Sequence, residues 1–401
     1  MPLTPDPATG RRHDIDALRV LAFGLLILYH CGMFYVADWG WHVKSAYLAE
    51  WLQYPMLFVN RWRMPLLFLV SGLAVSFLLP RIGPRELAWS RAKRLLLPLV
   101  FGMAVVVPPQ AYLQSLYNGA FDGSYLAFLH RYFTFQPWPA GAFDGSHAGV
   151  TWNHLWYLPY LLAYTLVLAA FLPAINSRAG RALRDRFRAL RGPWLVLAPA
   201  MPLVLATFVL APRFGRTYDV IHDWHQHAIY FTVFLYGYLM GRDAGLWNEL
   251  KRLRLALPLL AVAAFAAYLV PGDALPGSML LHRALFDFLE YVYAWCAILA
   301  VLAWSCTLLN RPFKWLAYAN EAVFPWYVLH QTITVVAGYQ LARLSLGPVI
   351  EPLLVVALTV LGCFALHEFV IRRAPLLRPL FGLKAKARGI HVAAMAHRAA
   401  G

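Results

Sequence analysis

The apolar residues of this chain fall into runs of membrane-spanning length that polar segments separate. Several runs are shorter than the usual twenty residues, and we expect neighbouring aromatic residues to extend them. The pattern predicts an all-α integral membrane protein, a polytopic bundle of about ten transmembrane helices. The predicted spans are roughly 15–35, 63–79, 95–113, 154–173, 194–211, 228–241, 255–270, 288–309, 323–343 and 349–371.

The composition excludes an ordinary soluble globular domain, because 61% of the residues are hydrophobic and only 13% are charged. The net charge of +16 follows the predicted topology. With an inside N-terminus, 26 of the 35 Lys and Arg residues lie in inside segments and six in outside segments. This bias predicts that both termini are cytoplasmic. It indicates anionic lipid as a partner and argues against nucleic acid.

The sequence predicts one membrane domain with short ends. Residues 1–14 form a cytoplasmic N-terminus, residues 15–371 the membrane domain, and residues 372–401 a basic cytoplasmic tail that we expect to be disordered at its end. The first apolar run contains charges that the core of a signal peptide would exclude, so we expect it to stay as an anchor.

Three connecting segments have a distinctive composition. Segments 36–62 and 114–153, both predicted outside, are rich in Trp, Tyr, Gly and Pro. Such residues suit either an interfacial aromatic belt or a sugar-stacking surface, and the sequence does not separate the two. The inside segment 174–193 has six arginines and predicts a basic helix that lies on the inner leaflet.

The most informative pair is Arg19 and His30, eleven residues apart in the first apolar run. Eleven residues make about three helical turns, which places both side chains on one face, about 16 Å apart along the axis. Charged and titratable groups are costly inside a bilayer, so the pair predicts a functional site. The alternative is an arginine that extends to the interface and a histidine bonded to a neighbouring helix.

Two further basic features point to anion binding. Arg91 and Arg94, three residues apart, share a helical face at the predicted cytoplasmic mouth and suit phosphate, although ordinary positive-inside charge also explains them. Arg63 is either an interface anchor or a site charge. Ser71 and Gly72 form a small-residue notch that allows helices to approach closely, and Ser71 could also donate a hydrogen bond.

Other polar residues lie at the ends or middle of predicted spans. Asn153 and His154 open one span, where they are either acceptor or oxyanion ligands or a helix cap beside an interfacial histidine. Glu321 lies near the inner face, and His330 about nine residues deeper. His330 and His30 reach a similar depth, which predicts one interior cavity for both.

Metal binding is not expected. A cluster of histidines and aspartates in one outer segment resembles metal ligands, but it has no cysteines and no firm helical spacing. An acceptor-loop or interfacial role fits these residues better: His222, His225, His227, Asp219 and Asp223.

Together these residues resemble the membrane acyltransferase-3 family over roughly residues 12–375. The matching features are Arg19 with His30, Arg91 with Arg94, and the notch at Ser71. Within that family the chain is similar to the succinyltransferases of osmoregulated periplasmic glucan biosynthesis. The stretches that carry this likeness are Asp16–Arg19, Arg63–Gly72, Val107–Gln110, His154–Leu158 and Asn320–Gln331.

The resemblance implies a bacterial inner-membrane enzyme that moves an acyl group, from cytosolic succinyl-CoA or acetyl-CoA, to hydroxyls of a periplasmic glucan. It implies acyl-CoA, a glycan acceptor, membrane lipid and other glucan biosynthesis proteins as partners, with no metal. Arg91, Arg94 and Arg19 would hold the CoA phosphates. His30 would be the general base, or would itself form an acyl-histidine. Arg19 and His330 are further candidates at the catalytic centre.

The expected substrate-binding residues are Arg63, Ser71, Asn153, His154 and Glu321. An O-acetyltransferase for another envelope glycan or for a small molecule is an alternative within the family. A secondary transporter of an anionic solute is an alternative of another class, because it would also use intramembrane Arg and His.

Overall fold

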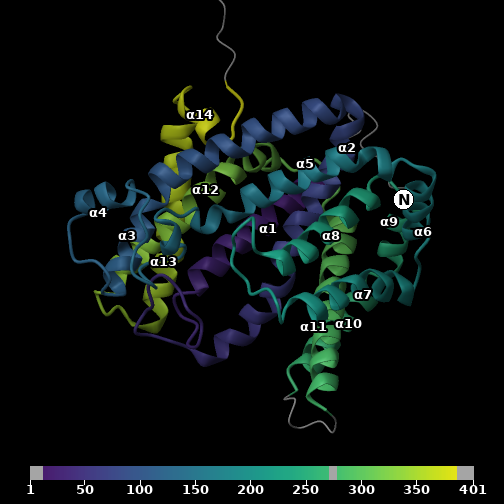
Figure 1. Cartoon of the computed structure of the whole chain (residues 1–401), viewed down its shortest axis with the longest axis horizontal. Helices are drawn as coiled ribbons and strands as arrows, with labels where there is room; N and C mark the ends of the chain where they lie inside the picture. Colours follow the sequence, from purple (N-terminus) through teal and green to yellow (C-terminus); the bar gives the residue numbers. More distant parts are fainter. Residues whose placement is uncertain (1–11, 271–277, 386–401) are drawn as a thin grey trace, which may run out of the picture.

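The computed structural model describes residues 12–270 and 278–385, and their secondary structure is helical apart from one isolated bridge between Val36 and Ala49. Figure 1 shows the helices gathered into one bundle, with α4 at one edge and α6 and α9 at the opposite edge. The α-helices are α1 (His13–Gly32), α2 (Gln53–Phe101), α3 (Pro108–Tyr117), α4 (Tyr125–Tyr132), α5 (Tyr157–Ile175), α6 (Arg178–Arg188), α7 (Pro193–Leu210), α8 (Trp224–Met240), α9 (Ala244–Arg252), α10 (Ala256–Tyr268), α11 (Met279–Leu308), α12 (Leu316–Leu341), α13 (Gly347–Ala365) and α14 (Leu377–Leu380).

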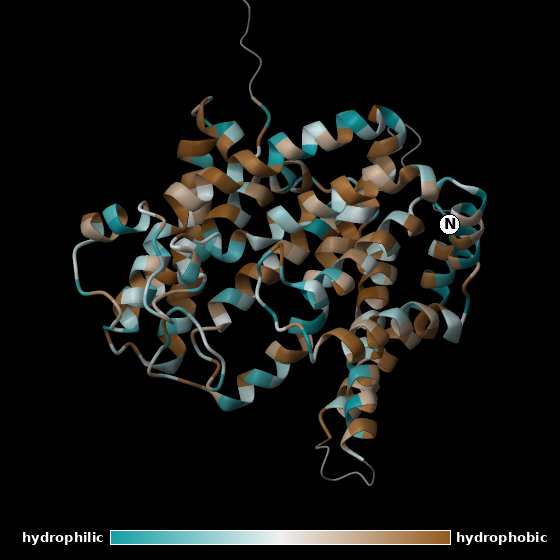
Figure 2. Ribbon diagram, in the orientation of Figure 1, coloured by the Kyte–Doolittle hydropathy of each residue, from teal (hydrophilic) through white to brown (hydrophobic). Residues whose placement is uncertain are grey.

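The structure confirms a helical membrane protein. Every predicted span coincides with helix, and Figure 2 shows the helices of the bundle coloured mostly as hydrophobic. In the described ranges, six helical segments are long and apolar enough to cross a membrane: His13–Gly32, Glu50–Val106, Asn153–Ile175, Pro193–Leu210, Met279–Leu308 and Gly347–Ile371. Ten crossings and cytoplasmic termini therefore stay predictions.

Helix α2 corrects the prediction that residues 80–94 form a loop. The chain is helical from Gln53 to Phe101, and the helix is interrupted at Gly83, whose φ of 73° and ψ of 170° are not helical. Pro80 and Pro84 flank this glycine, so the segment has the composition of a loop. Nevertheless, Gly83 is the residue of α2 whose backbone angles leave the helical range. The second limb of α2 continues into a π-helix, Gly102–Val106, and then into α3.

The small-residue notch packs helices, as the sequence predicts. A Cβ on Gly72 would lie 1.9 Å from the carbonyl oxygen of Phe234, and a Cβ on Gly237 would lie 2.0 Å from that of Leu69. The backbones of α2 and α8 therefore touch at two glycines that face each other, which side chains of any size would prevent.

The predicted basic segment 174–193 does contain a helix, α6, and none of its residues is buried. The first part of the predicted tail is described by the structure. Residues 372–385 are folded, and α14 packs on α2, with the rings of Phe101 and Phe381 5.3 Å apart. The prediction of disorder at the end of the tail falls on residues 386–401, outside the described residues, as does most of the predicted N-terminal segment.

Candidate active site

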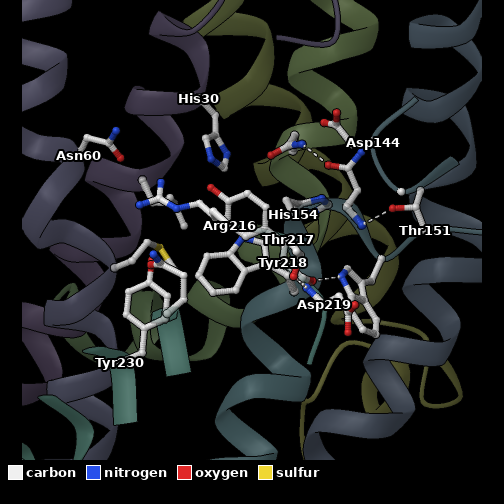
Figure 3. A pocket seen from close by; sticks show the side chains of 18 of the residues that line it. His30, Asn60, Asp144, Thr151, His154, Arg216, Thr217, Tyr218, Asp219 and Tyr230 are labelled. Carbon is white, nitrogen blue, oxygen red and sulfur yellow. Dashed lines mark hydrogen bonds between the residues drawn. The ribbon is translucent and has the colours of Figure 1, made fainter. Parts of the chain in front are cut away.

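A cavity of about 730 Å³ lies among the helix ends and the predicted outer segments. His30, Arg63, Asn153 and His154 line it, so the structure brings four of the predicted site residues together. Figure 3 shows His30 directed from its helix toward the cavity, with His154 and Arg216 nearby. Trp39 and Trp41, from predicted outer segment 36–62, also contribute to the wall.

His30 is held by His330 in one tautomer. The Nδ1 of His330 lies 2.7 Å from the carbonyl oxygen of Tyr327, which only accepts, so His330 carries its proton on Nδ1. Its Nε2, 2.8 Å from the Nδ1 of His30, is then the acceptor. Neutral His30 therefore donates from Nδ1 and has the lone pair on Nε2, which makes no hydrogen bond to any described residue. His330 itself does not line the cavity.

His154 lies edge-on to His330, with ring centroids 5.2 Å apart, but both of its nitrogens have partners. Its Nε2 donates to the carbonyl of Val328 at 3.1 Å, and its Nδ1 accepts from Gln110 at 3.4 Å. His154 thus links helices within the wall of the cavity and has no ring N–H directed at a substrate in this arrangement.

A buried network that the sequence analysis missed continues from His154. The Gln331 amide nitrogen lies 2.7 Å from Asn153 Oδ1, 3.1 Å from Gln110 Oε1 and 2.7 Å from His42 Nε2. His42 in turn donates from Nδ1 to Gln114 at 2.6 Å. These residues come from separate segments, so their spacing along the chain carries no signal of the network.

Three arginines reach the cavity, of which only Arg63 was singled out from the sequence. The guanidinium of Arg63 lies 3.4 Å from the ring centroid of Tyr29 and bonds Asn60 at 2.9 Å. Arg61 pairs with Glu290 at 3.3 Å. Arg216 is the third, and its position in a long outer loop gave no helical periodicity to recognise.

The other predicted arginines form a separate cluster. Arg19 bonds Asp16 at 3.0 Å and Asn320 at 2.7 Å, whereas Arg91 and Arg94 make no hydrogen bond or ion pair to the described residues. The three guanidiniums lie near enough to repel one another. None of them lines the cavity that contains His30.

Aromatic side chains join the two regions. The hydroxyl of Tyr157 lies 2.7 Å from that of Ser71. It is also near enough to Arg19 and Arg91 to interact with their charges. Its ring is 6.1 Å from that of Tyr327, and Phe23 contacts both, at 6.3 and 5.2 Å. Ser71 therefore lies with this aromatic trio and outside the cavity wall.

Glu321 lies away from the cavity. It bonds Arg378 at 3.1 Å and lies 3.6 Å from Arg372, so its contacts fix the segment after α13 to the start of α12. In the part of the chain that the structure describes, no group of three or more His, Cys, Asp and Glu side chains is arranged to hold a metal ion. Within the histidine cluster, the hydrogen bond from His222 holds the pKa of Asp219 below its usual value.

Comparison with known proteins decides the family. The model of an acyltransferase domain, that of the acyltransferase-3 family, matches residues 12–368. The chain belongs to this family. It is also similar to the glucans biosynthesis protein C of Escherichia coli strain SMS-3-5, with 25% identity over 179 residues, and to that of strain K12, with 24%. Each match covers 44% of this chain and 42% of the relative. No solved structure matches the chain.

The family and the helical fold together establish a multi-pass membrane acyltransferase. The cavity and the arginine cluster both have polar or charged groups that are available for substrates.

Proposed function

We propose that the protein transfers an acyl group from cytosolic acyl-CoA to a hydroxyl of a periplasmic glucan, with His30 as the general base. The observation that carries this proposal is the chain of hydrogen bonds from Tyr327 through His330 to His30, which directs a basic nitrogen toward a polar cavity. A family relative named for glucan biosynthesis supports the acceptor class.

In this mechanism, Nε2 of His30 takes the proton of the acceptor hydroxyl as its oxygen attacks the thioester carbonyl. The tetrahedral intermediate then collapses, the C–S bond breaks, and His30 returns the proton to the departing CoA thiolate. Nδ1–H of His30 stays bonded to His330 throughout and spreads the positive charge of the imidazolium. Attack by His30 itself, to give an acyl-histidine, uses the same lone pair.

The donor is assigned to the arginine cluster. Guanidiniums that lack partners bind phosphate oxygens by charge-assisted, often bidentate, hydrogen bonds. Arg91 and Arg94 have no hydrogen-bond or ion-pair partner among the described residues. Arg19 belongs to the same cluster and lies on the helix that carries His30. The acceptor is assigned to the cavity, where tryptophans and polar side chains suit a sugar.

The succinyl group is the proposed acyl group, and an arginine of the cavity would pair with its second carboxylate. Arg63 is the first candidate, because it lines the cavity and its charge reaches His30. Acetyl transfer to another envelope glycan or small molecule uses the same residues and is the second candidate within the family.

The test uses purified full-length protein in nanodiscs, with succinyl-CoA or acetyl-CoA and periplasmic glucan. We expect release of free CoA and a matching mass increase of the glucan, both abolished in His30→Ala. Full activity of His30→Ala would overturn the assignment of the base. Transport of an anionic solute with no consumption of CoA would instead support a transporter.

A further inference from the structure

A second, smaller cleft is separate from both substrate regions described above, because none of its residues lines the cavity or belongs to the arginine cluster. Its volume is about 160 Å³, and α2, α6 and the end of α8 form its walls. We call it the arginine cleft, defined by Ser76, Arg184, Arg188, Tyr238, Gly241 and Arg242, with Pro80 at its edge.

The arginine cleft has three guanidiniums and no carboxylate in its wall. The Nε of Arg184 is buried and makes no hydrogen bond, and its nearest carboxylate, that of the exposed Asp185, is 3.9 Å away. The charges of Arg184 and Arg188 both reach the hydroxyl of Tyr238. The charge of the cleft is therefore largely uncompensated.

Contacts with α8 hold the cleft in shape. Arg188 donates from Nε to the carbonyl of Leu239 at 2.9 Å, and the ring of Phe187 stacks on that of Tyr236 at 5.2 Å. Gly241 has a φ of 38°, and a Cβ there would lie 3.4 Å from Ser76 Oγ and 3.5 Å from an Nη of Arg188. A side chain at position 241 would narrow the cleft beside two of its polar groups.

Phosphate is the chemistry that fits, because several guanidiniums in one small cleft match its oxygens and its charge. Two sources could supply it: a phospholipid headgroup or a soluble phosphate compound. Leu183, next to Arg184 on the unburied helix α6, is 65% exposed. An exposed apolar side chain on this basic helix, although outside the wall of the cleft, favours a helix at the membrane surface and therefore a lipid as the source of the phosphate.

We propose that the arginine cleft binds the phosphate of an anionic phospholipid headgroup. The site is independent of the proposed acyl transfer, since none of its residues is placed in the catalytic or donor machinery. It gives the predicted contact of α6 with the membrane surface a defined anchor point.

The experiment is native mass spectrometry of delipidated full-length protein titrated with phosphatidylglycerol, with lipid-dependent thermal shift as a second readout. The variants are Arg184→Gln and, because Arg188 also bonds Leu239, Arg188→Gln and Arg188→Lys. Arg186→Gln is the matched control, with the same charge change on α6 outside the cleft. Phosphatidylcholine, inorganic phosphate and CoA are separate arms.

We expect affinity for phosphatidylglycerol to fall about five-fold in Arg184→Gln and Arg188→Gln, and to change little in Arg186→Gln and Arg188→Lys. Equal affinity in all variants, or equal binding of phosphatidylcholine, would overturn the proposal. Saturable stabilisation by CoA or inorganic phosphate that Arg184→Gln removes, with none from phosphatidylglycerol, would support a phosphate site but overturn the lipid source.

Discussion

Replacing His330 tests whether the base is held as the structure indicates. His330→Phe keeps an aromatic ring in the fully buried position beside His30, where the two imidazoles stack with centroids 5.0 Å apart. It removes the Nε2 acceptor, 2.8 Å from His30 Nδ1, and leaves that N–H without its partner. His330→Gln can restore an acceptor through its side-chain oxygen.

The magnitude follows from the difference between neutral and charged hydrogen bonds. The bond to His330 contributes about 1 kcal/mol when His30 is neutral and about 1.5–3 kcal/mol when it is an imidazolium. Its loss therefore raises the barrier by about 0.5–2 kcal/mol, and kcat of His330→Phe should fall about 2- to 30-fold. Loss of the base itself in His30→Ala should cost about 10²- to 10⁴-fold.

The assay measures release of free CoA from succinyl-CoA by full-length protein in nanodiscs, over a range of donor concentrations. Because His330 does not line the cavity, KM for the donor should not change, and His330→Gln should recover part of kcat. His130→Ala, at an exposed histidine of α4, is the control. Wild-type kcat in His330→Phe, or a loss expressed only in KM, would refute the proposed role.

Three further changes test the donor site, the packing and a surface ion pair. Arg91→Gln should raise KM for acyl-CoA about 10- to 150-fold with little change in kcat, because one charge-assisted phosphate contact contributes about 1.5–3 kcal/mol. An unchanged KM would argue against the donor site. Gly72→Ala should lower the melting temperature, because the new Cβ would lie 1.9 Å from the carbonyl oxygen of Phe234. Such overpacking costs about 1–3 kcal/mol. A melting temperature equal to that of the wild type would contradict the close contact. A hydrogen bond from Arg252 lowers the pKa of Glu249 to about 2, so its stabilisation is present above about pH 4.5 and is lost as the pH falls toward 2. Glu249→Gln should therefore melt at a lower temperature than wild type at pH 7, and a difference that did not shrink below pH 4 would contradict this origin.

The fold could be predicted from the sequence where one physical property decides it. Membrane-spanning length requires about twenty apolar residues, so the positions of the long apolar helices follow from hydropathy. The course of α2 could not be predicted in the same way. Pro80, Gly83 and Pro84 have the composition of a loop, and only the three-dimensional path shows that a single residue interrupts the helix.

The candidate site could be predicted only in part. Helical periodicity places Arg19 and His30 on one face, and equal depth brings His330 near His30, as the hydrogen bond between them shows. The sequence does not show on which side of His30 the cavity lies. It therefore could not distinguish a His330 that supports His30 from a His330 that lines the wall of the cavity. His42 and Arg216 lie in irregular segments, where the spacing of residues along the chain does not predict the direction of their side chains.

The partners of the arginines separate structural charges from charges that are available to a substrate. An intramembrane guanidinium is stable when a carboxylate, a carbonyl or an aromatic face shares its charge. Arg61 has Glu290, and this ion pair forms without any substrate. Arg91 and Arg94 lack such partners among the described residues and also repel each other. A polyanionic donor that bridges them, as proposed above, would offset this repulsion.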